Sequence, residues 1–352
     1  MSYKRRKPVR RPRRPASRKR RCGIPFLFFA GILICLLAPL ALLILFSDQN
    51  DLRPHQIGTG SLDHATIQVF RQEQGRVEEV LMEDYVKGVL AGEMPSSFPM
   101  EALKAQAVAA RTYGLARQQK LTREKGIGHA GAPVCDTTHC QVYRTPEELL
   151  ALKGKDWMNT GWLRIEEAVE LTRGQVLTYQ GSLAEQPLFH SASGGRTENS
   201  EDVFVAMVPY LRSVDSPYEE EAPHQNETLT LTLKEFAKKV NAAYPKLKTS
   251  SVNRDTVVIQ SRSQGEGVEK IKVGNLTLTG SQVRSILGLR SSQFTIGIDG
   301  SKILFTTDGY GHGVGMSQWG ASGMAKAGYS YQEILTHYYQ GVEIQQATVP
   351  SQ

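Results

Sequence analysis

Residues 81–118 of the chain read LMEDYVKGVLAGEMPSSFPMEALKAQAVAARTYGLARQ. In the first part, apolar residues recur at helical spacing at Leu81, Tyr85 and Val89, which predicts a helix over 81–92. Pro99 then opens a second, alanine-rich helix that extends to about residue 118, since proline is favoured in a first helical turn. One acidic residue, Glu93, is left at the junction of the two helices.

Strand patterns surround these helices. Runs rich in β-branched and aromatic residues predict strands at 65–70, 175–179, 187–190 and 302–307. Two helical segments follow the last strand, and Ser330 with Glu333 forms a capping-box pattern at the start of the second. The fold class we predict is α+β, with a main domain formed by 63–225 and 293–345 and a tail at 346–352.

Residues 226–292 differ from the rest of the chain. They predict a helix near 233–243, strands at 256–261 and 269–272, and a helix near 281–287. We interpret this segment as a smaller inserted α+β subdomain.

The amino-terminal end has the pattern of a membrane anchor. Residues 23–46 are 24 positions without an acidic or basic side chain, more than the roughly 20 needed to cross a bilayer. Residues 1–22 hold twelve Lys and Arg and no acid, which predicts a cytoplasmic tail. Because no small-residue cleavage site follows, we expect one uncleaved transmembrane helix, a linker at 47–62 and an ectodomain outside the cytoplasm.

The basic charge belongs to this tail. Of the 42 Lys and Arg residues, twelve precede residue 22, which leaves 30 against 35 Asp and Glu. The ectodomain is therefore slightly acidic, and we expect it to bind no nucleic acid. The tail itself suits anionic lipid at the cytoplasmic face.

Glu93 is the strongest candidate for chemistry. Its neighbours Leu90, Met94 and Phe98 are apolar, and desolvation by such neighbours raises the pKa of a carboxyl group. A carboxylic acid that stays protonated near neutral pH can act as a general acid. The residues alone also allow a solvated glutamate at a helix end.

Four residues offer metal ligands in a loop rich in glycine and threonine, and they are His129, Cys135, His139 and Cys140. Two thiolates and two imidazoles suit tetrahedral zinc. The irregular spacing and the adjacent pair His139 and Cys140 leave free thiols or a disulfide open as alternatives, and a disulfide is allowed outside the cytoplasm.

Four blocks of the sequence, in this order, resemble the stage II sporulation protein D family. They are 83–95, 101–113, 190–197 with 202–204, and 309–321. With the amino-terminal anchor, the resemblance extends over residues 20 to 345.

The resemblance implies a membrane-anchored lytic transglycosylase of peptidoglycan, so that the main domain is the catalytic domain. Such an enzyme cleaves the MurNAc–GlcNAc bond of glycan strands and leaves 1,6-anhydro-MurNAc ends, here during septal thinning and engulfment in sporulation. The resemblance also implies that Glu93 is the catalytic acid and base. The alternative is a non-catalytic, wall-binding adaptor that activates a separate amidase.

The same resemblance implies partners, a location and a cofactor. The partners are peptidoglycan glycan strands, the sporulation amidase named stage II sporulation protein P and the membrane protein named stage II sporulation protein M. The location is the mother-cell membrane at the septum and around the forespore. Members of the family can carry a structural zinc at a His/Cys loop of this type, which favours zinc here.

Glycine-rich segments in the third and fourth blocks are expected to bind sugar, because backbone amides and polar side chains there can reach hydroxyl and acetamido groups. The expected residues are His190, Ser191, Ser193, Gly194, Gly195, His312, Gly313, Ser317 and Gln318. A tight structural turn is the alternative. The serines lack the Gly-x-Ser-x-Gly elbow of a nucleophile. The Gly-x-Gly pattern at 311–313 lacks the third glycine of a dinucleotide loop, so we expect no organic cofactor.

Other candidates are weaker. Asp84, Asp202 and Asp308 are possible second carboxylates, but their places in the sequence favour structural roles. Aromatic side chains that could line a saccharide groove are Trp157, Trp162, Trp319, Tyr338 and Tyr339. For the two adjacent tyrosines we expect core packing instead.

Overall fold

The computed structural model describes residues 62–123, 128–245 and 252–347, all within one compact unit. The expected cytoplasmic tail, transmembrane helix and most of the linker lie outside the described residues. None of the helices in the described ranges combines the length and the apolar character that a membrane span requires. The mixed α+β class predicted from the sequence is confirmed.

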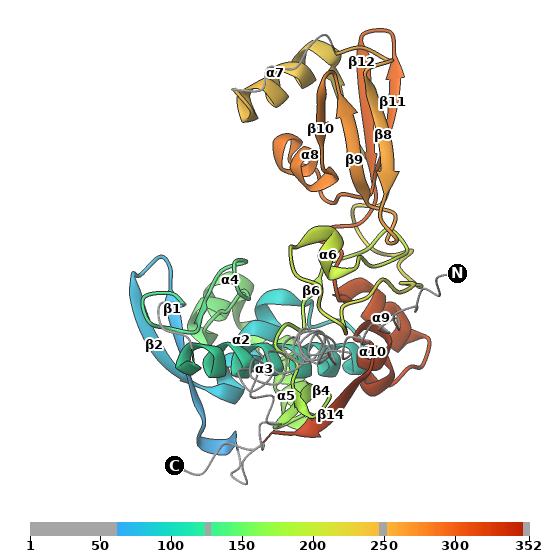
Figure 1. Ribbon diagram of the computed structural model, residues 1–352. Helices are drawn as coiled ribbons and strands as arrows, with labels where there is room; N and C mark the ends of the chain where they lie inside the picture. The colour runs from blue at the N-terminus through green and yellow to red at the C-terminus, as the bar shows by residue number, and fades with distance from the viewer. Residues whose placement is uncertain (1–61, 124–127, 246–251, 348–352) are drawn as a thin grey trace, which may run out of the picture. The chain divides into compact units, whose positions relative to one another are not determined.

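Three packed helices form the centre of the larger core, and Figure 1 shows them side by side. They are α2 (Met82–Glu93), α3 (Met100–Arg123) and α5 (Gly161–Leu171). Alanines at 102, 105, 107, 109 and 110 of α3 are fully buried. Such small side chains let neighbouring helices approach closely. α3 also contacts α9 (Gln318–Lys326) and β4 (Gln175–Tyr179). The two helices predicted at 81–92 and from Pro99 onward are confirmed.

Short sheets surround this helical layer. β1 (Thr66–Arg71) pairs with β2 (Arg76–Leu81) and β3 (Val134–Cys135), while β4 (Gln175–Tyr179) pairs with β5 (Ser182–Leu183) and β14 (Val342–Gln346). A third, parallel pair joins β6 (Phe189–His190) to β13 (Met316–Ser317). The remaining elements of this part are η1 (Leu62–His64), α4 (Pro146–Met158), α6 (Ser200–Val203), α9 (Gln318–Lys326) and α10 (Tyr331–Tyr338). The capping box predicted at the start of α10 is confirmed.

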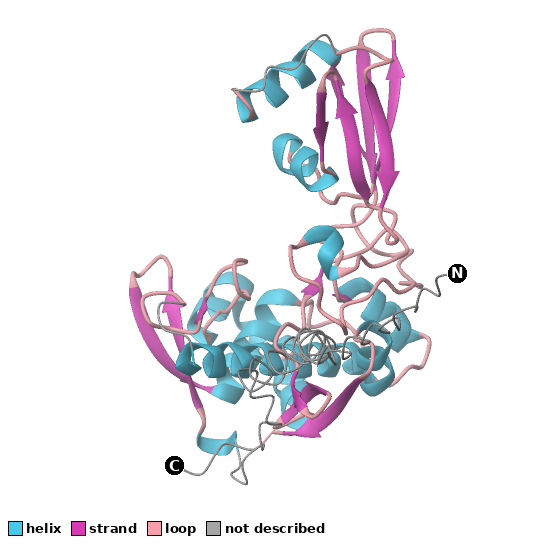
Figure 2. Cartoon of the chain, viewed as in Figure 1, coloured by secondary structure: helices cyan, strands magenta, loops and turns pink. Residues whose placement is uncertain are grey.

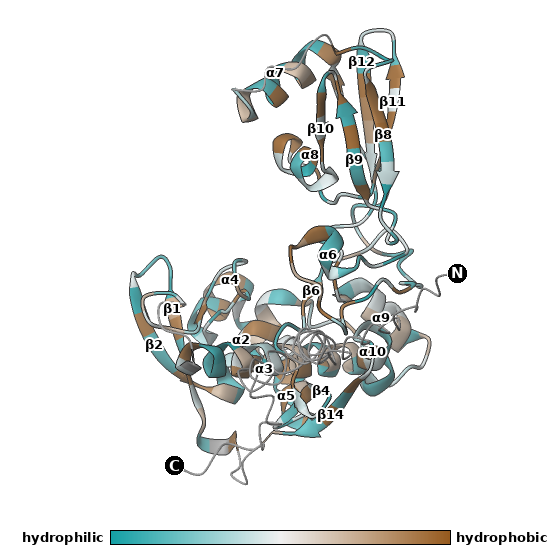
Figure 3. Cartoon of the chain, in the orientation of Figure 1, coloured by the Kyte–Doolittle hydropathy of each residue, from teal (hydrophilic) through white to brown (hydrophobic). Residues whose placement is uncertain are grey.

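A second hydrophobic core is formed mainly by strands (Figure 2). One sheet has the order β10-β9-β8 and another the order β11-β12-β7. The elements are β7 (Glu227–Thr232), α7 (Leu233–Ala243), β8 (Val257–Arg262), β9 (Val268–Val273), β10 (Leu276–Leu278), α8 (Gly280–Leu287), β11 (Phe294–Asp299) and β12 (Lys302–Thr307). Hydrophilic and hydrophobic residues alternate along α7 and β9, as expected for elements with one buried face (Figure 3).

The second core extends past the predicted subdomain boundary. Phe294, Ile303 and Phe305 are buried in it, although residues 293–345 were assigned to the main domain. The packing of β12 between β11 and β7 is the reason, because its inward residues face the same core. The division of the chain into domains itself stays a prediction.

Candidate active site

Glu93 is the last residue of α2. The helix ends there because Met94 adopts an extended conformation, with its amide still donating to the Leu90 carbonyl. The segment after the His/Cys loop then passes against the helix end: a Cβ on Gly92 would lie only 2.6 Å from the Val142 carbonyl oxygen. Only glycine permits this approach, which lets the Val142 amide donate to Glu93 Oε1 at 2.6 Å.

Burial raises the pKa of Glu93 above its ordinary value, and the hydrogen bond from Val142 opposes this in part. The apolar neighbours predicted to desolvate the carboxyl group are themselves buried, with Leu90, Met94 and Phe98 at most 5% exposed. Among the residues that the structure describes, no basic side chain forms an ion pair with Glu93. The physical cause expected from the sequence is therefore present.

Glu93 faces a cavity of about 530 Å³. The cavity is lined by segments distant in sequence, namely 187–191 and 310–312, and by single side chains of Tyr113, Thr138, Cys140, Gln141, Arg284 and Gln318. Its volume lies within the range of small-ligand sites. Of all the lining residues, Glu93 is the one carboxylic acid.

Two histidines from separate blocks of the sequence meet in this cavity. The ring centroids of His190 and His312 are 5.7 Å apart. A close approach of Gly311 allows this: its φ of +125° favours glycine, and a Cβ there would lie 2.7 Å from the His190 Cβ.

Both imidazoles are neutral near pH 7. Burial, with a smaller contribution from His312, lowers the pKa of His190 to about 3. Burial and the charge of Arg284 lower the pKa of His312 to about 4. The two imidazoles therefore add uncharged hydrogen-bonding groups to a cavity whose lining also includes the carboxyl group of Glu93 and the guanidinium group of Arg284.

The expected sugar-binding residues divide into two groups. His190, Ser191, His312 and Gln318 line the cavity with Glu93, whereas Ser193, Gly194, Gly195, Gly313 and Ser317 are not among its lining residues. The backbone amide and hydroxyl of Ser193 donate instead to buried Glu219, at 2.8 and 2.7 Å. Ser317 caps α9 by accepting from the Gly320 amide at 3.1 Å.

The three possible second carboxylates all lie away from the cavity that Glu93 faces. Asp84 pairs with Lys87 on the surface of α2 at 2.9 Å. Asp308 accepts from the Asn226 amide at 2.7 Å. Asp202 lines a different and smaller pocket.

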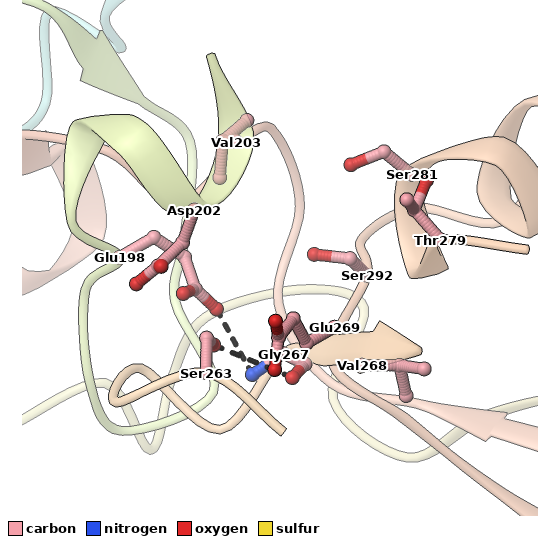
Figure 4. Close-up of a pocket in the computed structure, with 10 residues that line it drawn as sticks. All are labelled: Glu198, Asp202, Val203, Ser263, Gly267, Val268, Glu269, Thr279, Ser281 and Ser292. Atoms are coloured by element: carbon pink, nitrogen blue, oxygen red, sulfur yellow. Dashed lines mark hydrogen bonds between the residues drawn. The ribbon is translucent and has the colours of Figure 1, made fainter. Parts of the chain in front are cut away.

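Glu198, which the sequence analysis did not select, lines that smaller pocket of about 80 Å³ (Figure 4). The side chain is 2% exposed. Its Oε1 accepts from the Gly267 amide at 2.9 Å, while its Oε2 has no hydrogen-bond partner. Burial raises the pKa of Glu198. A glutamate in a polar loop carries no local signal of burial, because the burial comes from the distant turn at 263–267.

The aromatic candidates also lie elsewhere. Trp157, Trp162 and Trp319 do not line the Glu93 cavity; Trp319 packs against Phe98 with ring centroids 4.9 Å apart. Tyr338 and Tyr339 are fully buried, so the expectation of core packing is confirmed for them.

The four expected metal ligands come together. One donor atom from each of His129, Cys135, His139 and Cys140 lies within 4.8 Å of the others. Cys135 is positioned by the parallel pairing of β3 with β1, in which it is the register partner of Phe70. Both cysteines of the cluster are free thiols.

The distances in this cluster suit zinc. Cys140 Sγ lies 3.3 Å from His129 Nε2 and 3.7 Å from His139 Nδ1. Ligands at about 2.0–2.3 Å from a tetrahedral zinc ion are roughly 3.5 Å apart. The adjacent pair His139 and Cys140 is therefore compatible with one ion, and the donor set can hold a metal.

Comparisons with known proteins agree on one family. Residues 71–179 match the family model described as Stage II sporulation protein. The chain is 39% identical to Stage II sporulation protein D of Bacillus amyloliquefaciens, over 80% of this chain and 79% of that protein. It is equally similar to the protein of the same name from Bacillus subtilis (strain 168). It is also 31% identical to the Amidase enhancer of that strain, over 74% of this chain and 40% of that protein.

Proposed function

This chain belongs to the stage II sporulation protein D family, and from that membership we propose that it is a lytic transglycosylase of peptidoglycan with Glu93 as its acid and base. The observation that carries the proposal is that Glu93 is the one carboxylic acid in the residues that line its cavity. An ordinary glycosidase uses two carboxyl groups at a defined separation. A single carboxyl group instead favours a reaction in which the substrate supplies its own nucleophile.

The reaction balances with this one residue. Protonated Glu93 donates its proton to the glycosidic oxygen as the bond from that oxygen to C1 of MurNAc breaks. The C6 hydroxyl oxygen of the same MurNAc bonds to C1, and its proton passes to the Glu93 carboxylate. The products are a 1,6-anhydro-MurNAc end and a GlcNAc with a free 4-hydroxyl, no water is consumed, and Glu93 is again protonated.

The surroundings of Glu93 support this role. Burial raises its pKa, so a larger fraction is protonated near neutral pH. Because the two histidines are neutral, they place no imidazolium ion beside the departing oxygen. Apart from Glu93 and Arg284, the polar side chains that line the cavity are uncharged, which suits the uncharged hydroxyl and amide groups of a sugar polymer.

A zinc ion bound by His129, Cys135, His139 and Cys140 would be structural, since a site closed by four protein ligands leaves no open position for substrate. These residues immediately precede the segment that supplies the Val142 amide to Glu93. Holding this segment in place would keep the hydrogen bond to the carboxyl group.

The proposal includes the cellular setting implied by the family. A helix at 23–46 would anchor the chain in the mother-cell membrane and keep the catalytic domain within reach of septal peptidoglycan. The sporulation amidase, stage II sporulation protein P, would remove stem peptides before glycan cleavage. Stage II sporulation protein M would be a membrane partner.

The decisive experiment treats peptide-free glycan strands with the full chain in detergent and analyses the products by mass spectrometry. We expect anhydro ends from the wild type and a loss of at least about 100-fold in rate for Glu93→Gln, because general acid catalysis contributes that much or more. Asp84→Asn, a change at an exposed position of the same helix, is the matched control and should cleave normally. Reducing ends in place of anhydro ends would show hydrolysis and refute the mechanism.

A second function is favoured by the similarity to the Amidase enhancer. In this alternative the chain binds the wall and activates an amidase without cleaving glycan. The test measures release of stem peptides by a purified sporulation amidase with and without the chain. Stimulation that is equal for wild type and Glu93→Gln, with no anhydro product from either, would establish the adaptor function.

A further inference from the structure

The pocket that Glu198 lines differs in chemistry from the Glu93 cavity. Every polar side chain in its wall ends in oxygen (Figure 4). Three of them are the carboxylates of Glu198, Asp202 and Glu269, and of the described residues that form this wall none is basic. The others are the hydroxyl groups of Ser263, Thr279, Ser281 and Ser292. Oxygen donors without nitrogen or sulfur suit a hard cation such as calcium or magnesium rather than zinc.

Oε2 of Glu198 is a buried acceptor without a hydrogen-bond partner. The residue is 2% exposed, and its other carboxylate oxygen accepts from the Gly267 amide at 2.9 Å. A buried acceptor that lacks a partner is costly to the folded protein, more so when it belongs to a charged group. The pocket in front of it has a volume of about 80 Å³, which is sufficient for a metal ion or a water molecule.

Negative charge accumulates around this carboxylate. Burial is the largest cause of the raised pKa of Glu198, and the charges of Asp202 and Glu266 raise it further. Asp202 forms no salt bridge within the described part of the chain, and it accepts from the Asn199 side chain at 3.0 Å. A water molecule could satisfy Glu198 Oε2 but would leave this charge uncompensated. A divalent cation would do both.

The two sides of the pocket come from segments that are distant in the sequence. Glu198 and Asp202 belong to the segment around α6, whereas all four hydroxyl groups come from residues 263–292. In Figure 4, the hydroxyl groups of Ser281 and Ser292 point toward the side on which Glu198 and Asp202 lie. A cation in the pocket would therefore be bound from both segments.

Both segments also contribute to the wall of the Glu93 cavity. The Glu198 amide donates to the Gly313 carbonyl oxygen at 2.7 Å, and the preceding residue, His312, lines that cavity. Ser281 lies in the first turn of α8, and Arg284 of the same helix lines the cavity as well. A cation in the Glu198 pocket would therefore hold two walls of the catalytic cavity in place.

We propose that this pocket binds a calcium ion, with the carboxylates of Glu198 and Asp202 as charged ligands and the facing hydroxyl groups as neutral ones. Calcium accepts six to eight oxygen ligands in irregular geometry, whereas magnesium requires a near-ideal octahedron and tends to retain its water. The site is separate from the His/Cys cluster, whose nitrogen and sulfur donors do not suit calcium. The inference is independent of the proposed function, because it concerns no step of glycan cleavage.

Titration calorimetry tests calcium binding directly, with the full chain in detergent after dialysis against calcium-free buffer. We expect one ion per chain with a Kd of about 1 mM or lower, the range of protein calcium sites, and weaker binding of magnesium. Glu198→Gln and Asp202→Asn should each weaken calcium binding by at least about tenfold, as loss of a metal-binding group does. Asp84→Asn should bind as the wild type does. Failure of the wild type to bind, or unchanged binding in both pocket variants, would overturn the inference.

Thermal unfolding shows whether the pocket variants are folded. Without calcium, Glu198→Gln should have a Tm near neutral pH at least equal to that of the wild type, because it removes an uncompensated buried carboxylate. With calcium at about ten times its Kd, the Tm of the wild type and of Asp84→Asn should rise by about 2–4 °C, and that of Glu198→Gln should not. An equal rise in all three chains would show screening of surface charge and would overturn the inference.

Hydrogen exchange followed by mass spectrometry locates the ion. Calcium should slow amide exchange in peptides that cover 198–203 and 263–269, because it binds these segments together, and should leave 129–140 unchanged. Slower exchange only at 129–140 would place the calcium ion at the His/Cys cluster and would overturn the inference.

Discussion

At the scale of single residues, two glutamates have pKa values raised by burial but face cavities of different size. Burial raises the pKa of both Glu93 and Glu198. Glu93 faces a cavity of about 530 Å³, where a protonated acid can meet a substrate. Glu198 lies in a pocket of about 80 Å³ and binds the Gly267 amide. Whether a carboxyl group with a raised pKa can act on a substrate therefore depends on the volume of the cavity that it faces.

The pH dependence of glycan cleavage should report Glu93. Because the reaction requires the protonated acid, the rate should fall as pH rises through the raised pKa of Glu93. His190 and His312, with pKa values of about 3 and about 4, are neutral over this range and should add no second step above them. Initial rates of anhydro-end formation between about pH 5 and 9 check this; a rate that rises throughout would contradict it.

Glu198→Gln should change how stability depends on pH. The folded protein holds the Glu198 proton more tightly than the unfolded chain, so the stability of the wild type falls as pH rises from the unfolded pKa through the raised one. The variant lacks this pH-dependent loss of stability. Each unit by which the pKa is raised corresponds to about 1.4 kcal/mol in the free energy of unfolding. In urea unfolding, the free energy of unfolding of the variant should rise relative to that of the wild type between acidic and neutral pH. A constant difference would contradict the prediction.

At the scale of elements, a buried ion pair joins α2, α3 and β4. Arg111 Nη2 lies 2.6 Å from Glu83 Oε2, and the side chains are 0% and 7% exposed. Glu83 also accepts from the Gly174 amide at 3.2 Å, and Arg111 donates to the Gln175 carbonyl oxygen at 3.1 Å. The pair thus fixes the start of α2, at the opposite end of the helix from Glu93.

Glu83→Ala should lower the free energy of unfolding by about 3–5 kcal/mol, because it leaves the Arg111 charge buried without its partner. Asp84→Ala, which removes the exposed partner of Lys87 in the next position of the same helix, should cost less than about 1 kcal/mol. Urea unfolding followed by circular dichroism measures both. Similar losses in the two variants would show that burial of the pair contributes little.

At the scale of the whole molecule, the His/Cys cluster connects strands β1 and β3 to the Glu93 cavity. Cys135 lies on β3 beside β1, and Cys140 lines the Glu93 cavity. The segment between them also carries Asp136, which accepts from the buried Arg71 at 3.0 Å. A metal at the cluster would therefore stabilise the part of the fold that positions Glu93.

Elemental analysis of the purified chain should find about one zinc ion per molecule, because the four donors suit a closed tetrahedral site. Cys135→Ser should lose the metal and unfold at a lower temperature, since metal binding contributes to folding free energy. His64→Asn changes an exposed histidine outside the cluster and should do neither. A wild-type chain that binds no metal, and whose mass is short by two hydrogens, would show a disulfide instead.

Local sequence was sufficient for the features that depend on nearby residues. Apolar spacing marked α2, proline marked the start of α3, and Ser330 with Glu333 marked the start of α10, because helical hydrogen bonds and caps join residues three or four positions apart. The apolar neighbours of Glu93 likewise anticipated its raised pKa. Strands β2, β7 and β14 were not predicted, since each is stabilised by pairing with a partner strand rather than by its own residues.

The arrangement of the site needed the folded chain. His190 and His312 are 122 positions apart, and only the pairing of β6 with β13 and the close approach of Gly311 bring them together. The same packing turns Ser193 toward Glu219 and away from the cavity. It also buries Glu198 beneath a turn that lies about 70 residues later. Burial and long-range contacts arise from tertiary packing, which the residue types in a short segment do not encode.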